Sequence, residues 1–198
     1  MTTLQNRDGL DRELMLRARE DDLSAFEELY ARYSRPLMNF FFRLTWDRGF
    51  SEDLMQETFL RLWKGRGNYR PTGKFTTYLF QIGKNHWLNE RDKRSRRIKP
   101  VSLEAAGAAE SNGLREAVAS GERGPVSDSL NKELGAAIAK AVDGLSEKLK
   151  LVFVMGQLNG MRYADVAEIL EIPVGTVKSR MANADKIIRG RLEPYLRS

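Results

Sequence analysis

Residues 172–181, "IPVGTVKSRM", start a helix with residues that seldom start one and continue with basic and hydroxyl side chains. Proline is tolerated at or near the first helical position, because the amide hydrogen that it lacks would be unpaired there anyway. The small residues Gly175 and Thr176 let the helix N-terminus approach a phosphate, which free N–H groups and the helix dipole attract. The stretch therefore predicts a helix whose N-terminal end meets nucleic acid.

A second helix is expected just before this one. Residues 163–170, "YADVAEIL", are expected to bury Val166, Ala167 and Leu170, and only the short turn 171–173 follows. Two short helices that cross at a small residue such as Ala167 form a helix-turn-helix, whose second helix enters the major groove. A helical wheel of that second helix gathers its apolar residues in one stripe: Val177, Met181, Ala184 and Ile188.

The opposite side of the second helix supplies the candidate DNA contacts. Lys178, Ser179 and Asn183 can reach base edges, while Arg180 is placed to hold the phosphate backbone. An ordinary helical hairpin with a solvated basic face is the alternative, and the pattern by itself does not say which process it serves. The complete set of predicted upstream contacts is Gly175, Thr176, Lys178, Ser179, Arg180 and Asn183.

Charge is distributed unevenly along the chain. The net charge of +6 is a weak indication of nucleic acid, because many soluble proteins are mildly basic. Residues 91–99 hold six basic side chains and one acid, whereas residues 51–60 hold three acids and no base. Such segregation indicates two different partners.

Composition also limits the setting of the protein. Zero cysteines exclude disulfides and cysteine-based metal sites, and fit a reducing cytoplasm. No stretch approaches the apolar run that spans a bilayer, and residues 1–13 lack the order of a signal peptide. We therefore expect a cytoplasmic protein with no direct membrane insertion.

The hydrophobic periodicity is helical, and no segment alternates convincingly as a strand. Ser24 with Glu27 has the spacing of a capping box, and Ser51 is expected to cap the next helix. Residues 101–129 are rich in glycine and alanine and contain no aromatic residue, which is typical of a linker. We predict an all-α protein with two small helical domains, 1–99 and 131–198, joined by a flexible linker over 100–130.

Three stretches, in order along the chain, make the pattern more specific. They are "AFEELYARYSRPLMNFFFRL" with "SEDLMQETFLRLWKG", then "FTTYLFQIGKNHWLNERDKR", then "IPVGTVKSRM". Together they resemble the extracytoplasmic-function (ECF) sigma factors, the compact bacterial subunits that give RNA polymerase its promoter specificity. The resemblance implies a region 2 domain that binds core polymerase and reads the minus-10 element, and a region 4 domain whose helix-turn-helix reads the upstream (minus-35) element.

The acidic helix is the candidate polymerase contact. One side of its wheel is apolar, and the other gathers Asp53, Gln56, Glu57 and Leu60. A surface leucine among acids is unfavourable in water but useful against a partner's helix. The resemblance implies that this face docks on the clamp helices of the β′ subunit, with the β flap as a further polymerase contact. A solvated acidic helix face is the alternative.

Residues before the linker are candidates for promoter opening. The resemblance places Tyr69 and Asn85 where an aromatic and an asparagine capture a flipped base, with the loop Thr72–Gly73–Lys74 between them. Opening about ten base steps at roughly 1.4 kcal/mol each exceeds the 1–3 kcal/mol or so that stacking one base supplies, so core polymerase must take part. The predicted minus-10 contacts are Arg61, Tyr69, Lys74, Asn85, Asn89 and Arg91; the basic run for backbone contact is Arg91, Lys93, Arg94, Arg96, Arg97 and Lys99.

Some residues depart from the family's pattern. Glu171 stands where a glycine is usual, and Arg162 stands where Ser or Thr commonly caps the first helix of the motif. Ala182, Asn183 and Asp185 replace a more basic continuation. These departures bear on base specificity rather than on the family.

Other functions explain less of the sequence than a sigma factor does. No enzyme, cofactor or metal site is expected, because the chain has a single histidine, no cysteine and no phosphate-cradling glycine motif. A stand-alone helix-turn-helix regulator would leave the acidic helix without a purpose, and a polymerase adaptor would leave the recognition helix without one. Since no sensor domain is evident, we expect an anti-sigma factor to hold the chain inactive.

Overall fold

The computed structural model describes residues 2–98 and 125–196, and the side chains of residues 8–96 and 134–193. Every regular element in these residues is helical, and no strand occurs among them, which confirms the all-α prediction. The chain divides into two compact units, formed mainly by α1–α4 and by α6–α9.

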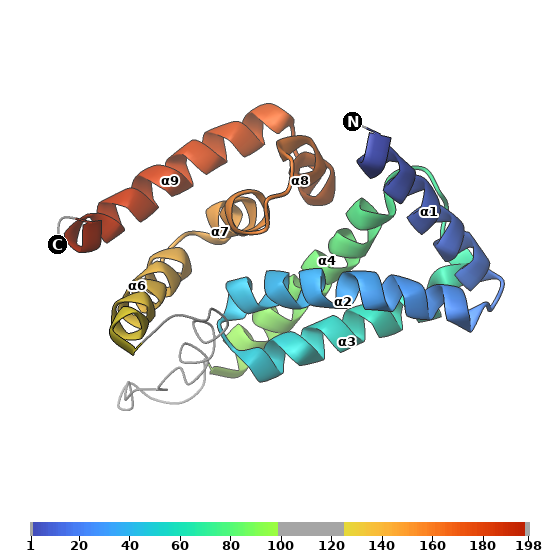
Figure 1. Cartoon of the computed structure of the whole chain (residues 1–198), viewed down its shortest axis with the longest axis horizontal. Coiled ribbons are helices and arrows are strands. Elements are labelled where there is room, and N and C mark those ends of the chain that lie inside the picture. Colours follow the sequence, from blue (N-terminus) through green and yellow to red (C-terminus); the bar gives the residue numbers. More distant parts are fainter. Residues whose placement is uncertain (1, 99–124, 197–198) are drawn as a thin grey trace. The chain divides into compact units, whose positions relative to one another are not determined.

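The N-terminal unit is a helical bundle in which α2 and α3 run side by side (Figure 1). Helix α1 packs against α4 and against the short helix η1 that follows α3. Gly83 of α4 lies at a close crossing, because an added Cβ would lie 3.1 Å from Phe41 Cζ and 3.3 Å from Leu37 Cδ1 on α2. The elements are α1 Thr2–Arg19, α2 Leu23–Thr45, α3 Arg48–Lys64, η1 Arg66–Asn68 and α4 Phe75–Ile98.

Aromatic residues fill the core of this unit. The Phe40 ring lies 5.2 Å from that of Phe41 and 5.4 Å from that of Phe80, and all three side chains are buried. Their packing joins α2 to α4, so the position of α4 is set by apolar contacts rather than by its polar face.

The predicted caps of two helices are wrong by a few residues. Asp22 Oδ1 accepts from the amide of Ala25 at 3.1 Å, so Asp22 rather than Ser24 caps α2. Asp47 Oδ1 accepts from the amide of Phe50 at 2.9 Å, and α3 therefore starts before Ser51, whose hydroxyl donates to the carbonyl of Asp47 at 2.6 Å. An aspartate at the N-cap reaches an unpaired amide, while serine inside the first turn bonds back to the backbone.

The C-terminal unit is built around α9, which packs against α6, α7 and α8 (Figure 1). The start of α6 at Pro125 falls within the stretch predicted as a linker, most of which lies outside the described residues. Arg191 of α9 reaches the end of α6, where Nη1 donates to the carbonyl of Ala141 at 2.6 Å and Nη2 to that of Gly144 at 3.0 Å. The elements are α6 Pro125–Asp143, α7 Glu147–Phe153, the π-helical turn η2 Val154–Leu158, α8 Tyr163–Leu170 and α9 Val174–Leu196.

Candidate functional site

Helices α8 and α9 form the predicted helix-turn-helix. Only residues 171–173 separate the end of α8 from the start of α9. In α8 the buried residues are Val166, Ala167 and Ile169; the prediction of Leu170 is wrong, since its side chain is only partly buried at the last position before the turn. The apolar stripe of α9 is buried as expected: Val177, Met181, Ala184 and Ile188.

Burial of that stripe turns the opposite side of α9 to solvent. Gly175, Lys178, Ser179 and Asn183 are exposed, and Thr176 and Arg180 are partly buried. The Ser179 hydroxyl donates to the carbonyl of Thr176 at 3.0 Å, which leaves its oxygen able to accept a further hydrogen bond. No described atom lies within 4 Å of the place where a Cβ on Gly175 would be, so close approach from outside is open there.

The turn of the motif is a Schellman motif without glycine. The amide of Ile172 donates to the carbonyl of Ala167 at 3.1 Å, and that of Glu171 to the carbonyl of Glu168 at 3.3 Å. Glu171 adopts the left-handed conformation with φ 56° and ψ 44°. The residue that departs from the family's pattern thus occupies the one position of this turn that favours glycine.

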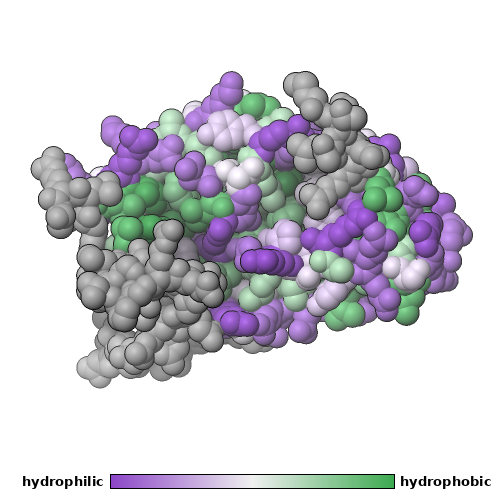
Figure 2. All heavy atoms as spheres, viewed as in Figure 1, coloured by the Kyte–Doolittle hydropathy of each residue, from purple (hydrophilic) through white to green (hydrophobic). Residues whose placement is uncertain are grey.

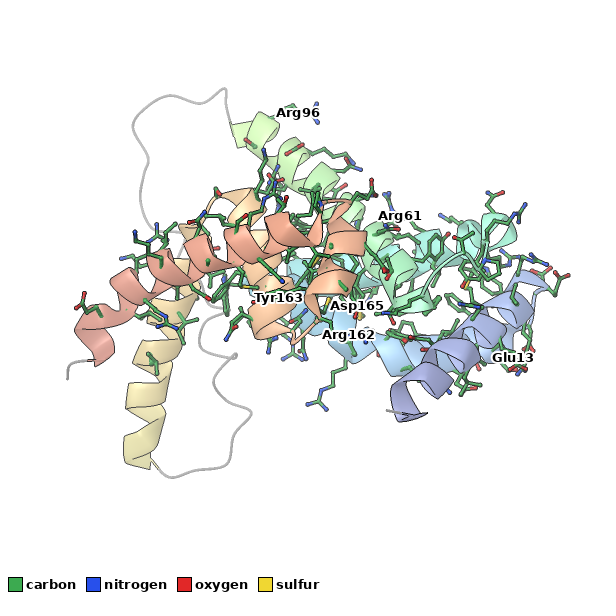
Figure 3. The ribbon with its side chains drawn as sticks, turned by 90° about the horizontal axis from the view of Figure 1, so that it is seen from above. Glu13, Arg61, Arg96, Arg162, Tyr163 and Asp165 are labelled. Carbon is green, nitrogen blue, oxygen red and sulfur yellow. The ribbon has the colours of Figure 1, made fainter. Side chains whose placement is uncertain are left out.

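Arg162 takes the N-cap position of α8 and makes no capping hydrogen bond with its side chain. It pairs instead with Asp165, with Nε 3.0 Å from Oδ2, and Figure 3 shows the two side chains next to each other at the start of α8. Asp165 lies in the first turn, where a negative charge interacts favourably with the helix dipole.

The acidic side of α3 is exposed as predicted. Asp53, Gln56 and Leu60 face solvent, and Leu60 is 49% exposed. Glu57 accepts from Arg61 across one helical turn, with Nε 2.9 Å from Oε1. The same helix buries its other side: Leu54, Met55, Thr58, Phe59 and Leu62. A predicted polymerase contact, Glu57, and a predicted DNA contact, Arg61, are therefore joined in one ion pair.

An apolar groove of about 370 Å³ adjoins this side of α3. Tyr30, 40% exposed, lies with its ring 4.7 Å from that of Phe59, and Leu23 is 57% exposed. The groove is lined by Leu23, Phe26, Tyr30, Gln56, Phe59, Leu60 and Trp63. Sequence reasoning missed its α2 side, although apolar residues at 23, 26 and 30 are spaced for one helix face.

Helix α4 displays the predicted asparagines and leads into the basic run. Asn85 and Asn89 are exposed one turn apart. The guanidinium of Arg91 lies 5.3 Å from the centre of the Trp87 ring and pairs with Asp92, with Nη2 2.7 Å from Oδ1. Lys93, Arg94 and Arg96 are exposed, and Figure 3 shows Arg96 at the far end of α4; the side chain of Arg97 and all of Lys99 lie outside the described residues.

Tyr69 is not where a stacking ring would be useful. Its side chain is 2% exposed, with the ring 5.2 Å from that of Tyr78. Burial raises the pKa of its hydroxyl, which has no hydrogen-bond partner among the described residues. The extended backbone after η1 carries this ring into the unit, so the ring that the resemblance assigns to base capture is not exposed in this structure. The loop residues Thr72 and Gly73 are exposed, and Lys74 is partly buried.

His86 is buried beneath α3. Burial, and next the positive charge of Arg61, lower the pKa of His86, while Glu90 and Glu57 oppose the shift. Among the described residues no group of acidic and histidine side chains could hold a metal ion. No helix in residues 2–98 or 125–196 has the length and apolar character to cross a bilayer.

Comparison with known proteins shows which family the chain belongs to. Residues 29–97 match the model of sigma-70 region 2, and residues 135–186 match that of sigma-70 region 4. The RNA polymerase sigma-H factor of Pseudomonas aeruginosa is 30% identical over 189 residues, covering 94% of this chain and 96% of that protein. The ECF RNA polymerase sigma-E factor of Escherichia coli is 28% identical over the same length and with the same coverage.

Solved structures share the fold. CnrH, solved in complex with the cytosolic domain of CnrY, superposes with a TM-score of 0.68 at 21% identity, covering 93% of this chain and 98% of that one. The sigma factor RpoE of Bartonella quintana, solved with the anti-sigma factor NepR, gives 0.64 at 21% identity, covering 85% and 96%. With two sigma-70 regions and relatives along nearly its whole length, the chain belongs to the ECF group of RNA polymerase sigma factors, which direct promoter-specific initiation of transcription and are not enzymes.

Proposed function

We propose that the α9 surface reads the upstream (minus-35) promoter element. The observation that carries this proposal is the two-sided character of α9, where Val177 and Met181 are buried while Gly175, Lys178 and Asn183 face solvent. The open space at Gly175 suits a phosphate at the helix N-terminus. Ser179 and Lys178 then lie one turn further along, within reach of base edges.

The minus-10 element is assigned to the loop 70–74 and the exposed side of α4. Asn85 offers both a donor and an acceptor to an unstacked base, and Asn89 continues toward the duplex. Tyr69 takes part by supporting the loop from within the unit rather than by stacking. Lys93, Arg94 and Arg96 add sequence-independent affinity that falls with salt.

Core RNA polymerase is assigned to the acidic side of α3, where the β′ clamp helices would dock. The adjoining groove supports this assignment, because its apolar lining meets the exposed Leu60 and Gln56 and extends the contact beyond charge alone. For the β flap we assign the C-terminal unit, where apolar surface gathers over α6 and α9 (Figure 2). Leu134 and Ile187, each 37% exposed, belong to these helices.

An anti-sigma factor is the proposed regulator. The Bartonella relative was solved with the anti-sigma factor NepR, and a partner of this class would compete with polymerase for the exposed apolar surface of α2 and α3. The chain is proposed to act in the cytoplasm, with the promoter and the polymerase. Recovery of no partner from cells in which the chain is constitutively active would count against this regulation.

The first test is transcription in vitro from fragmented DNA of the source organism, with the chain and core polymerase. We expect discrete start sites that share two upstream elements and disappear with Glu57→Lys, which reverses charge on the proposed polymerase contact. Glu13→Lys is the matched control, because Glu13 is exposed on α1 (Figure 3) and the charge change is the same. DNA binding without core-dependent starts would favour a stand-alone regulator; equal loss in both variants would remove Glu57 from the polymerase contact.

A further inference from the structure

Contacts from α1, from the turn after it and from Tyr33 of α2 hold the segment that contains the minus-10 loop, residues 70–74. This segment runs from η1 through Tyr69 to the first turn of α4. The contacts reach it at three places, before, within and after the loop. None of them comes from a residue that the resemblance connects with promoter reading.

The first contact lies before the loop. Arg66 of η1 pairs with Asp21, with Nε 2.9 Å from Oδ1. Asp21 lies in the turn between α1 and α2 and has φ 67°, a backbone conformation that is uncommon for residues other than glycine. The Arg66 guanidinium also lies 4.0 Å from the centre of the Trp63 ring and donates to the Trp63 carbonyl at 2.9 Å. The start of the segment is thus fixed to both α3 and the α1–α2 turn.

The second contact lies after the loop and is buried. Asp11 of α1 is 1% exposed and accepts from the hydroxyl of Tyr33 and from Arg32, whose Nη1 lies 2.7 Å from Oδ1. The Tyr33 hydroxyl also lies 3.2 Å from Oγ1 of Thr76, the second residue of α4. A buried carboxylate needs such partners, because an unpaired charge there would be strongly destabilising. Asp11 therefore fixes the place where the loop enters α4.

The third contact reaches the loop itself. Arg12 Nη2 donates to the carbonyl of Gly73 at 3.5 Å, a long and exposed hydrogen bond. Apart from its chain neighbours, no described atom lies within 4 Å of a would-be Cβ on Gly73. The loop is thus held by Arg12 of α1 and has free space at Gly73.

We propose that Asp11 and Tyr33 are positioning residues for minus-10 recognition, and that α1 sets the conformation of the loop 70–74 through the chain Asp11–Tyr33–Thr76. This inference rests on the assignment of the minus-10 element to the loop. Neither residue touches DNA in this scheme. They act by fixing the first turn of α4, which the loop enters.

Tyr33→Phe tests the inference, because it removes the bridging hydroxyl and keeps the ring that lies 5.3 Å from the ring of Phe75. Tyr163→Phe is the matched control, because it removes a tyrosine hydroxyl from an exposed position on α8, in the other unit. Each full-length variant is combined with core polymerase on two promoter pools, one randomised in the minus-10 element and the other in the upstream element. Thr76→Val is a second variant that breaks the same chain of contacts at its other end.

The expected result is loss of about tenfold in sequence discrimination in the minus-10 pool for Tyr33→Phe and Thr76→Val, with discrimination in the upstream pool unchanged. Tyr163→Phe should match the wild type in the minus-10 pool. Equal losses in the two pools, or no loss in either, would overturn the inference; if Tyr33→Phe does not fold, Thr76→Val decides by the same criterion. A wild-type chain that gives no core-dependent starts from either pool rejects the proposed function, and the inference with it.

Discussion

Glu171 occupies a backbone conformation that is unfavourable for any residue other than glycine. Its left-handed conformation, φ 56°, costs a residue with a Cβ about 1–2 kcal/mol relative to glycine. We expect Glu171→Gly to raise the free energy of unfolding of the C-terminal unit by about 1 kcal/mol, since glycine gives back part of the gain as backbone entropy. Denaturant titration of the full chain, followed by a probe in the C-terminal unit, measures the change.

Glu171→Ala separates strain from charge at this position. Alanine keeps the Cβ and removes the carboxylate, so it should leave the strain in place. If Glu171→Ala stabilises as much as Glu171→Gly, the carboxylate and not the backbone is responsible. Affinity for DNA should rise in both variants, because each removes a negative charge from a turn next to the recognition helix.

His86 makes stability depend on pH. Its pKa is lowered by burial, so the unfolded chain binds a proton more readily than the folded one. Its contribution to stability is present above the unfolded pKa of about 6.5 and is lost as the pH falls toward the lower, folded pKa. We expect the free energy of unfolding of the N-terminal unit to fall as the pH drops below about 6.5, and this dependence to be smaller in His86→Gln. An unchanged slope in that variant would assign the dependence to other groups.

At the scale of the helix, two glycines in helical segments should respond in opposite ways to the same substitution. Gly190 of α9 is exposed with no described atom within 4 Å of a would-be Cβ, so Gly190→Ala should stabilise by about 0.5–1 kcal/mol. Gly83 of α4 lies against Phe41 and Leu37, so the methyl group of Gly83→Ala must displace them, and overpacking costs about 1–3 kcal/mol. Thermal unfolding of the two variants compares them directly. Stabilisation by Gly83→Ala would show that the side chains of α2 at the crossing can move to make room for the methyl group.

The helices themselves were well predicted, whereas their ends were not. Periodicity identifies a buried face because burial selects apolar residues every three to four positions, and the stripe of α9 is confirmed on this basis. Ser24 and Ser51 do not mark the starts of their helices, because Asp22 and Asp47, a few residues earlier, accept hydrogen bonds from the free amides instead. Several residues near a helix start are capable of capping, and only the backbone decides which one does.

Across the whole molecule, burial and exposure were predicted correctly where they follow from the spacing within one helix. The exposed side of α3 and the buried stripe of α9 are of this kind. Tyr69 and the groove depend on several elements. The burial of Tyr69 depends on η1 and α4, and the groove needs residues 23–30 of α2 against residues 56–63 of α3. Sequence spacing within one helix carries no information on such pairings.

Because two units lie on one chain, each DNA-binding surface can be small and the protein can still bind a promoter. Each surface offers a few contacts, and the net charge of +6 is shared over 198 residues. Once one unit is bound, the second finds its own element at a raised effective concentration set by the linker between them. Under the proposed assignment, affinity at a promoter then depends on both elements together.

The position of Trp63 gives the groove a spectroscopic reporter of its own. Its indole lines the groove, lies 4.0 Å from the Arg66 guanidinium and 4.9 Å from the ring of Phe26, and is only partly buried. Trp87 is 4% exposed, and neither it nor the partly buried Trp46 lines the groove. A partner that fills the groove must remove water from Trp63, so its emission shifts to shorter wavelength as binding proceeds. Docking of polymerase or of an anti-sigma factor at this surface can therefore be followed in the unlabelled protein, with Trp63→Phe as the silent reference.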